Sequence, residues 1–189
     1  MTELPNRSVS RRRLLAGAAA GLSVGVAGCS GGENASITPV SLDGERACDQ
    51  CGMIIEDHPG PVGQIHFADD EPEGGRPGQF CSSTCTYRYR FDAEAEGRTV
   101  EAAFLTDYSS VEYEVFTEGG DTQFSSHVES EAFERMPALT VVARSEVVGA
   151  MGPELIPFSE EGDVTAFTDE YGGEPMPATD VKRSTLEAL

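Results

Sequence analysis

Two close pairs of cysteines constrain the fold of this chain more than any other feature of its sequence. Cys48 and Cys51 form a Cys-x2-Cys pair, and Cys81 and Cys85 form a Cys-x3-Cys pair after 29 intervening residues. Each pair contains a turn-sized gap, so two short knuckles can deliver four sulfurs to one tetrahedral metal ion. We therefore predict a metal site made from both pairs.

Two disulfides are the alternative interpretation of these cysteines outside the cytoplasm, and three connectivities would be available. The surroundings of the second pair favour metal. Ser82 is expected to cap a helix over residues 83–95, which places Cys81 and Cys85 at the positive end of the helix dipole, one turn apart. That position favours the thiolate, which is the form of cysteine that binds metal.

The residues next to the first pair bear on which metal is bound. Met53 follows Cys51 by two residues, and Gly52 between them permits a tight turn. A thioether together with thiolates selects Cu(I), whereas four thiolates alone suit Zn²⁺. Taken alone, Met53 is equally well explained as a core residue, because methionine fills gaps in apolar cores.

The N-terminus carries an export signal. Residues 10–15 read Ser-Arg-Arg-Arg-Leu-Leu and open an apolar run that ends at Cys29. The run is too short to cross about 30 Å of hydrocarbon as a helix, so residues 1–28 are expected to be a leader. The arginine pair resembles a twin-arginine signal, and the small residues before Cys29 resemble a lipoprotein cleavage box. We predict that Cys29 carries a lipid that anchors the protein to the outer face of the cell membrane, and that residues 29–45 form a flexible tether.

The charge balance excludes one class of partner. The chain has a formal net charge of −20, and because its first 28 residues hold four arginines and one glutamate, the remaining 161 residues carry about −23. Such a surface repels phosphate backbones, so nucleic acid is excluded as a partner. The simplest explanation for so many carboxylates is a halophilic habitat. The length beyond the leader fits one domain, expected over residues 46–181, with residues 182–189 as a C-terminal helix or tail.

Short strands and helices are predicted along the rest of the chain, with no usable internal repeat. Alternation over residues 62–67 indicates a half-buried strand with His66 on its polar face, between the two cysteine pairs. Glycines and prolines break residues 147–158 and are expected to hold Met151 in a constrained loop. Further strands are predicted over residues 99–106, 111–116 and 139–143, and further helices over residues 163–171 and 180–186.

The sequence lacks the motifs of common enzymes. It contains no Gly-rich phosphate loop, no Gly-x-Ser-x-Gly elbow and no His-Glu-x-x-His motif, and its three histidines are scattered. A thiol-disulfide oxidoreductase using Cys48 and Cys51 is disfavoured, because no βαβ pattern precedes that pair. We therefore predict a binding protein rather than an enzyme.

Four motifs follow one another in a specific order over residues 48–181. They are Cys48-Asp49-Gln50-Cys51-Gly52-Met53-Ile54-Ile55, Gly63-Gln64-Ile65-His66-Phe67, Ala150-Met151-Gly152 with Pro157-Phe158, and Ala166-Phe167 ahead of Glu170-Tyr171-Gly172-Gly173. Their order and spacing resemble the NosL family, the accessory lipoproteins of nitrous oxide reductase. The resemblance implies an α+β fold of small antiparallel sheets, short helices and ββα-like units. It also implies an exported Cu(I) chaperone that works beside an ABC-type transporter and helps to assemble the copper centres of the reductase.

The resemblance also assigns roles to individual residues. Metal ligands are implied at Cys48, Cys51, Met53, His66 and Met151, and the acylated cysteine of the family matches Cys29. The segment Phe80-Cys81-x3-Cys85 fits the family less well and is similar to the TRASH type of heavy-metal module. The chain is therefore expected to hold a closed four-thiolate site, an open copper site that uses Met53 or Met151, or both. The competing function is a zinc-stabilised docking module of a membrane-associated complex.

Overall fold

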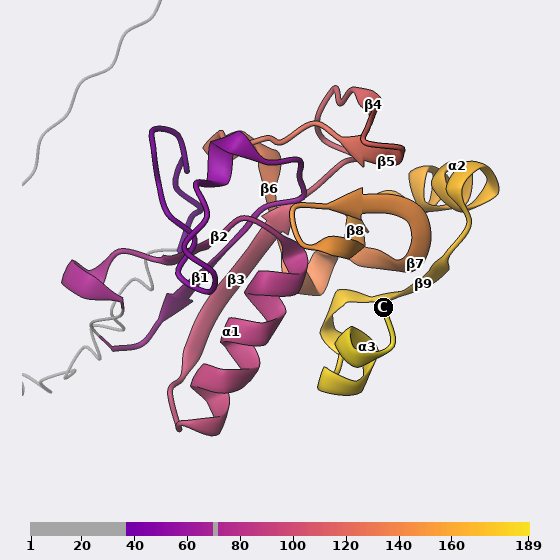
Figure 1. Ribbon diagram of the computed structural model, residues 1–189. Helices are drawn as coiled ribbons and strands as arrows, with labels where there is room; N and C mark the ends of the chain where they lie inside the picture. Colours follow the sequence, from indigo (N-terminus) through magenta and orange to yellow (C-terminus); the bar gives the residue numbers. More distant parts are fainter. Residues whose placement is uncertain (1–36, 70–71) are drawn as a thin grey trace, which may run out of the picture. The chain divides into compact units, whose positions relative to one another are not determined.

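The computed structural model describes residues 37–69 and 72–189 (Figure 1). Over these residues the chain has an α+β fold with two β-sheets and three α-helices, which confirms the predicted fold class. No helix within the described ranges is long and apolar enough to cross a membrane. The leader and Cys29 lie outside the described residues. Short 3₁₀ turns occupy Ile55–Asp57, Glu73–Gly75, Ser130–Ala132, Met136–Ala138 and Ala178–Asp180.

The first sheet is antiparallel throughout, with the strand order β2-β1-β3-β6. Its strands are β1 (Gly63–Phe67), β2 (Gly78–Phe80), β3 (Val100–Thr106) and β6 (Phe133–Arg135), and helix α1 (Ser83–Ala95) follows β2. Helix α1 approaches β1 closely at Gly63, where a Cβ atom would collide with Thr86 Oγ1. The glycine therefore sets the distance between the helix and the sheet.

The second sheet is built around one long strand. Its elements are β4 (Val115–Glu118), β5 (Asp121–Phe124), β7 (Thr140–Gly149), β8 (Gly152–Phe158) and β9 (Glu174–Pro177), with α2 (Glu161–Tyr171) and α3 (Arg183–Glu187) after β8 and β9. Strand β7 pairs with β8 on one edge and with β9 and β5 on the other. The β5–β7 pair is parallel, so the expectation of antiparallel sheets holds for every other pair.

The two halves of the domain repeat one topology. In the first, β1 and β2 pair, α1 follows, and β3 returns to pair with β1; in the second, β7 and β8 pair, α2 follows, and β9 returns to pair with β7. Both halves are ββα units closed by a third strand. The sequence shows no internal repeat, because the topology is repeated without matching side chains.

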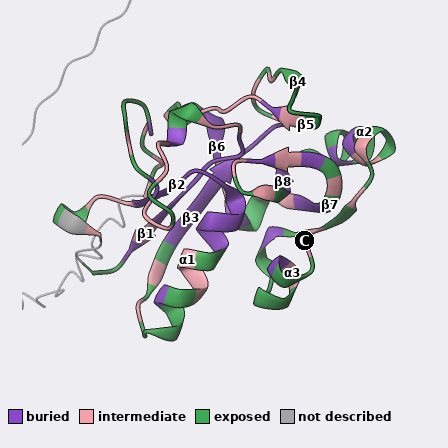
Figure 2. Ribbon diagram, in the orientation of Figure 1, coloured by how far each residue is buried: buried purple, intermediate pink, exposed green. Residues whose placement is uncertain are grey.

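Two apolar clusters form the core. Strands β7 and β8 contribute to both, because alternate side chains point to opposite faces of a sheet. Val141 and Leu155 pack in the first cluster with α1 and the first sheet, whereas Val142 and Ile156 pack in the second with α2. Helix α1 packs on this core by its N-terminal end: Figure 2 shows that its first turn is buried and its C-terminal end is exposed.

The element boundaries partly match the predictions. The helix predicted over residues 83–95 is α1, and the strands predicted over residues 62–67 and 99–106 are β1 and β3. The strand predicted over residues 111–116 begins only at Val115. Residues 147–158, predicted as an irregular constrained loop, are mainly the arms of the β7–β8 hairpin, whose tip is Ala150 and Met151.

The segment before the first cysteine pair lies on the domain. Leu42 is fully buried, and its N–H donates to the Val128 carbonyl at 2.7 Å. The amide of Gln64 exchanges two hydrogen bonds of 2.9 Å with the backbone of Val40. Residues 37–45 were expected to belong to the flexible tether. These contacts instead pack part of that segment onto the domain, so the packed part of the chain begins before residue 46.

Candidate metal centre

The first cysteine pair lies in a tight knuckle. Ala47 and Ile54 form an isolated antiparallel bridge, inside which the N–H of Cys48 donates to the Met53 carbonyl and the N–H of Gly52 donates to the Cys48 carbonyl, both at 2.8 Å. Gly52 has a φ of +79°, a conformation that favours glycine. The knuckle brings the sulfur atoms of Cys48 and Cys51 within 4.8 Å of each other.

The second pair lies at the junction of β2 and α1. Cys81 follows the last residue of β2, and the hydroxyl of Ser82 accepts a 2.8 Å hydrogen bond from the N–H of Cys85, which confirms Ser82 as the helix cap. The thiol of Cys85 therefore lies in the first turn of α1, where the helix dipole stabilises negative charge.

The four sulfurs form one cluster. The Sγ atoms of Cys48, Cys51, Cys81 and Cys85 all lie within 4.8 Å of one another, with 3.5 Å between Cys51 and Cys81 and 3.9 Å between Cys81 and Cys85. Four sulfurs at about 2.3 Å from a central ion would be about 3.8 Å apart in a tetrahedron. All four cysteines are free thiols, so the two-disulfide alternative finds no support in the structure.

Burial and charge are unequal within the cluster. Cys48, Cys81 and Cys85 are buried, whereas Cys51 is exposed. Hydrogen bonds from Cys81 and Cys85 lower the pKa of the Cys48 thiol, and the same contacts with Cys48 raise the pKa of Cys81 and Cys85. Without metal, Cys48 is therefore the favoured thiolate, and Cys81 and Cys85 keep their protons. Binding of a metal ion to all of these sulfurs must release those protons.

An acidic side chain between the first two cysteines clamps the knuckle to β2. Asp49 forms a two-pronged ion pair with Arg76, with contacts of 2.7 and 2.8 Å. Its Oδ2 also accepts from the Gln79 N–H at 2.8 Å, while its own N–H donates to the Gln79 carbonyl at 2.9 Å. This clamp was not predicted; the only sign of it in the sequence is an acidic residue, Asp49, between the two cysteines of the first pair.

Glu154 of β8 joins the hairpin that carries Met151 to the first turn of α1. Its Oε1 accepts hydrogen bonds from the N–H and the hydroxyl of Thr84, both at 2.8 Å, and from the Leu155 N–H at 2.9 Å. Complete burial raises the pKa of Glu154 to about 7, against the opposing effect of these hydrogen bonds. The role of Glu154 was not predicted, although a single acidic residue within the apolar run of residues 147–158 is a sign of it.

The other predicted ligands occupy three different places. Met53 is half-buried within the knuckle and packs against the first core cluster. Met151 is exposed at the hairpin tip, three residues before Glu154. His66 points to the face of β1 opposite Phe67, which contacts Tyr89 of α1, and its ring meets Phe104 edge-on. The structure thus brings the four cysteines together and leaves His66 on the other face of the first sheet.

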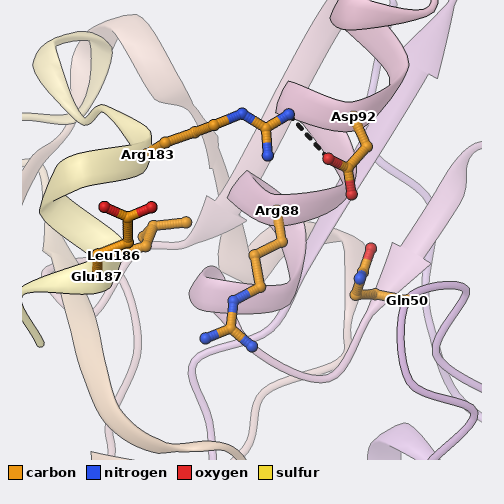
Figure 3. Close-up of a pocket in the computed structure, with 6 residues that line it drawn as sticks. All are labelled: Gln50, Arg88, Asp92, Arg183, Leu186 and Glu187. Carbon is orange, nitrogen blue, oxygen red and sulfur yellow. Dashed lines mark hydrogen bonds and ion pairs between the residues drawn. The ribbon is translucent and has the colours of Figure 1, made fainter.

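A small cavity adjoins the knuckle at Gln50. It encloses about 270 Å³ between the knuckle, α1 and α3 (Figure 3). Its lining residues are Gln50, Arg88, Asp92, Arg183, Leu186 and Glu187. Arg183 of α3 pairs with Asp92 of α1 at 2.8 Å, so the last helix is tied to the helix that carries Cys85.

Comparison with known proteins places this chain in a family. The sequence profile of NosL matches residues 39–186. The chain belongs to the NosL family. It is 27% identical over 168 residues to the copper-binding lipoprotein NosL of Stutzerimonas stutzeri, a match that covers 88% of this chain and 78% of that protein. NosL proteins are not enzymes, which confirms the prediction of a binding protein.

A solved NosL structure has the same fold. The crystal structure of the copper chaperone NosL from Shewanella denitrificans matches with a TM-score of 0.60 and 23% sequence identity, over 76% of this chain and 95% of that chain. The resemblance found in the sequence is therefore confirmed at the level of family and fold.

Proposed function

We propose that this protein is an exported, lipid-anchored carrier of Cu(I) that helps to assemble the copper centres of nitrous oxide reductase. One observation carries the proposal: in a chain of the NosL family, four cysteine sulfurs lie within 4.8 Å of one another, and one of them is exposed. Relatives named as a copper-binding lipoprotein and a copper chaperone support copper as the cargo.

The chemistry of the cluster suits a soft cation. Thiolate and thioether ligands select Cu(I), and Met53 adds a thioether two residues from Cys51. Met151 would supply a second thioether from the hairpin that Glu154 holds against α1. A carrier must also release its cargo, which requires a labile ligand. Cys51 is exposed, so a thiol of the acceptor would replace it first as a ligand of the ion. The buried cysteines Cys48, Cys81 and Cys85 would release the ion last.

The place of action follows from the leader. A twin-arginine signal over residues 1–28 would export the folded protein, and a lipid on Cys29 would hold it at the outer face of the membrane. The partners there are the reductase, as acceptor, and an ABC-type transporter, as expected for a NosL protein. The strongly negative charge keeps nucleic acid out of this role.

A zinc-stabilised docking module is the second candidate function. The observation that favours it is the compact set of four cysteines, since four thiolates alone are a common closed zinc site. In this case Met53 and Met151 would be packing residues. The two functions predict different metals in protein isolated from its own cells.

The test is metal analysis of the native protein, followed by anaerobic titration of residues 30–189 with Cu(I) against a chromogenic chelator. We expect one tightly bound Cu(I) that displaces any zinc present. Zinc that Cu(I) cannot displace, with no second site, would contradict the carrier function and support the docking module.

Single substitutions locate the site in the same titration. We expect Cys51→Ser and Met151→Ala each to weaken Cu(I) binding about tenfold or more, with an unchanged circular dichroism spectrum. The matched control is Met176→Ala, because Met176 lies in β9 and packs on the core away from the hairpin tip. Full Cu(I) affinity in both test variants would refute the assignment of these ligands.

A further inference from the structure

A groove between α2 and the segment leading into β4 is lined by none of the predicted metal ligands. It encloses about 430 Å³ and is more spacious than the cavity beside the knuckle. Figure 1 shows α2 near the β4–β5 hairpin of the second sheet, and residues of α2 and β4 line the same groove. The groove adjoins the second core cluster, whereas the cysteines belong to the first.

One wall of the groove is a single face of α2. Asp163, Ala166, Phe167 and Glu170 are spaced i, i+3, i+4 and i+7, which places them in one stripe along the helix. Phe167 is buried in the second core cluster, while Asp163 and Glu170 are exposed on either side of it. This wall therefore has an apolar centre flanked by two carboxylates.

Aromatic rings complete the groove. Tyr113 stacks on Phe124 with 4.4 Å between ring centroids, and Tyr171 meets Phe124 edge-on at 5.8 Å. Tyr171 also packs against Phe167 at 5.2 Å, so the rings fix one another. Val115 lies at the rim of the groove and is 45% exposed.

The groove is negative and lacks a cation of its own. Partial burial, and then the charges of Asp163 and Glu170, raise the pKa of the Tyr113 phenol. Burial and Glu170 likewise raise the pKa of Tyr171. Among the described residues that line the groove there is no lysine or arginine. No positive charge among these lining residues therefore offsets the negative charges of Asp163 and Glu170 near the rings.

We propose that this groove binds an arginine side chain presented by a basic segment of a partner protein. A guanidinium stacks on aromatic faces and pairs with carboxylates, and this groove supplies both next to each other. Carboxylates elsewhere on the surface attract any cation by charge alone. The rings of this groove add a flat apolar surface on which a planar guanidinium can stack. The inference goes beyond metal carriage, because no cysteine or predicted metal ligand lines the groove.

The direct test is an NMR titration of the metal-loaded mature protein with Nα-acetyl-arginine amide. Its neutral isostere, Nα-acetyl-citrulline amide, is the control ligand. We expect saturable shifts of the Tyr113, Phe167 and Tyr171 ring signals with the arginine compound, and binding about tenfold weaker with citrulline. Equal binding of the two compounds, or no ring shifts with either, would overturn the proposal.

A charge-matched pair of variants separates the groove from the general acidity of the surface. The double variant Asp163→Asn with Glu170→Gln should weaken arginine binding about fivefold, whereas Glu161→Gln with Asp169→Asn should leave it unchanged. Glu161 and Asp169 are exposed on α2 but do not line the groove. An equal loss in both variants would show that only net charge attracts the probe and would refute a specific site.

Discussion

At the scale of single residues, Glu154 is a carboxyl group buried in the core, where its charged form is unfavourable. Its Oε1 accepts three hydrogen bonds, while its Oε2 has no hydrogen-bond partner among the described residues. Oriented donors hold one oxygen in place, but burial still disfavours the charged form. The residue thus holds the Met151 hairpin to the helix of Cys85 at a cost that depends on pH.

We predict that Glu154 makes the protein less stable as the pH rises. Burial raises the pKa of Glu154 from 4.5 to about 7, so between these values the unfolded chain has lost a proton that the folded chain keeps. Below 4.5 both states are protonated and the contribution is constant; above about 7 the accumulated loss is about 3 kcal/mol. Glu154→Gln keeps an Oε1 acceptor and has no proton to lose. In urea unfolding of the reduced, metal-free protein, the variant should therefore gain on the wild type by that amount between pH 4 and pH 8.

The control for this comparison is Glu146→Gln. Glu146 is exposed in the irregular part of β7, so its substitution should leave the pH dependence of the unfolding free energy unchanged. The thiols titrate in all three proteins and cancel in the differences. Parallel pH profiles for Glu154→Gln and the wild type would mean that Glu154 does not carry this dependence.

At the scale of elements, the contact of α1 with β1 positions the first turn of α1, which carries Cys85. A Cβ at Gly63 would collide with Thr86 Oγ1 and lie 2.9 Å from a methyl of Leu105. We predict that Gly63→Ala pushes the first turn of α1 outward, lowers the free energy of unfolding by about 1–3 kcal/mol and weakens metal binding through Cys85. The measurements are chemical unfolding and metal titration.

Gly162→Ala is the matched control for this prediction. Gly162 lies in the first turn of α2, and a Cβ there meets nothing within 4 Å. This substitution should raise the free energy of unfolding by about 0.5 kcal/mol and leave metal affinity unchanged. If both alanines had the same effect, the close approach at Gly63 would not matter.

The elements also show what the sequence could predict. Helix α1 was predictable residue by residue, because Ser82 caps it and the cysteine spacing marks its first turn. Strand β8 was not, because Pro153 and Pro157 argue against a central strand. Both prolines are tolerated because β8 is an edge strand that pairs only with β7. That position depends on contacts between distant segments, which local patterns do not contain.

The candidate site divides in the same way. The four cysteines were predictable as one cluster, because ligand spacing follows from the chemistry of the ion. The position of His66 was not, since alternation places a side chain on a face without saying which face the helix covers. The clamp by Asp49 and the support by Glu154 depend on Arg76 and Thr84, which only the folded chain brings to them.

At the scale of the whole molecule, charge repulsion opposes the compact state. Beyond the leader the chain carries about −23, a net charge that already counts every lysine and arginine in that part of the chain. Repulsion between like charges is strongest at low salt, where the Debye length is long. The Debye length is about 10 Å in 0.1 M salt and falls to about 3 Å in 1 M salt, where most of the repulsion is screened. The stability of the protein should therefore depend on salt even where its metal does not change.

We predict that the thermal midpoint of metal-loaded residues 30–189, followed by circular dichroism, rises by about 5 °C or more between about 0.1 M and 1 M KCl. Potassium chloride suits the test because it acts mainly by screening, and a neutral osmolyte at the same osmolality separates screening from exclusion of solute. The osmolyte should give a smaller rise, since it leaves the repulsion between carboxylates unscreened. A midpoint independent of KCl would mean that the carboxylates are far enough apart, or well enough hydrated, to fold without screening, and would remove the reason to assign the protein to a halophilic habitat.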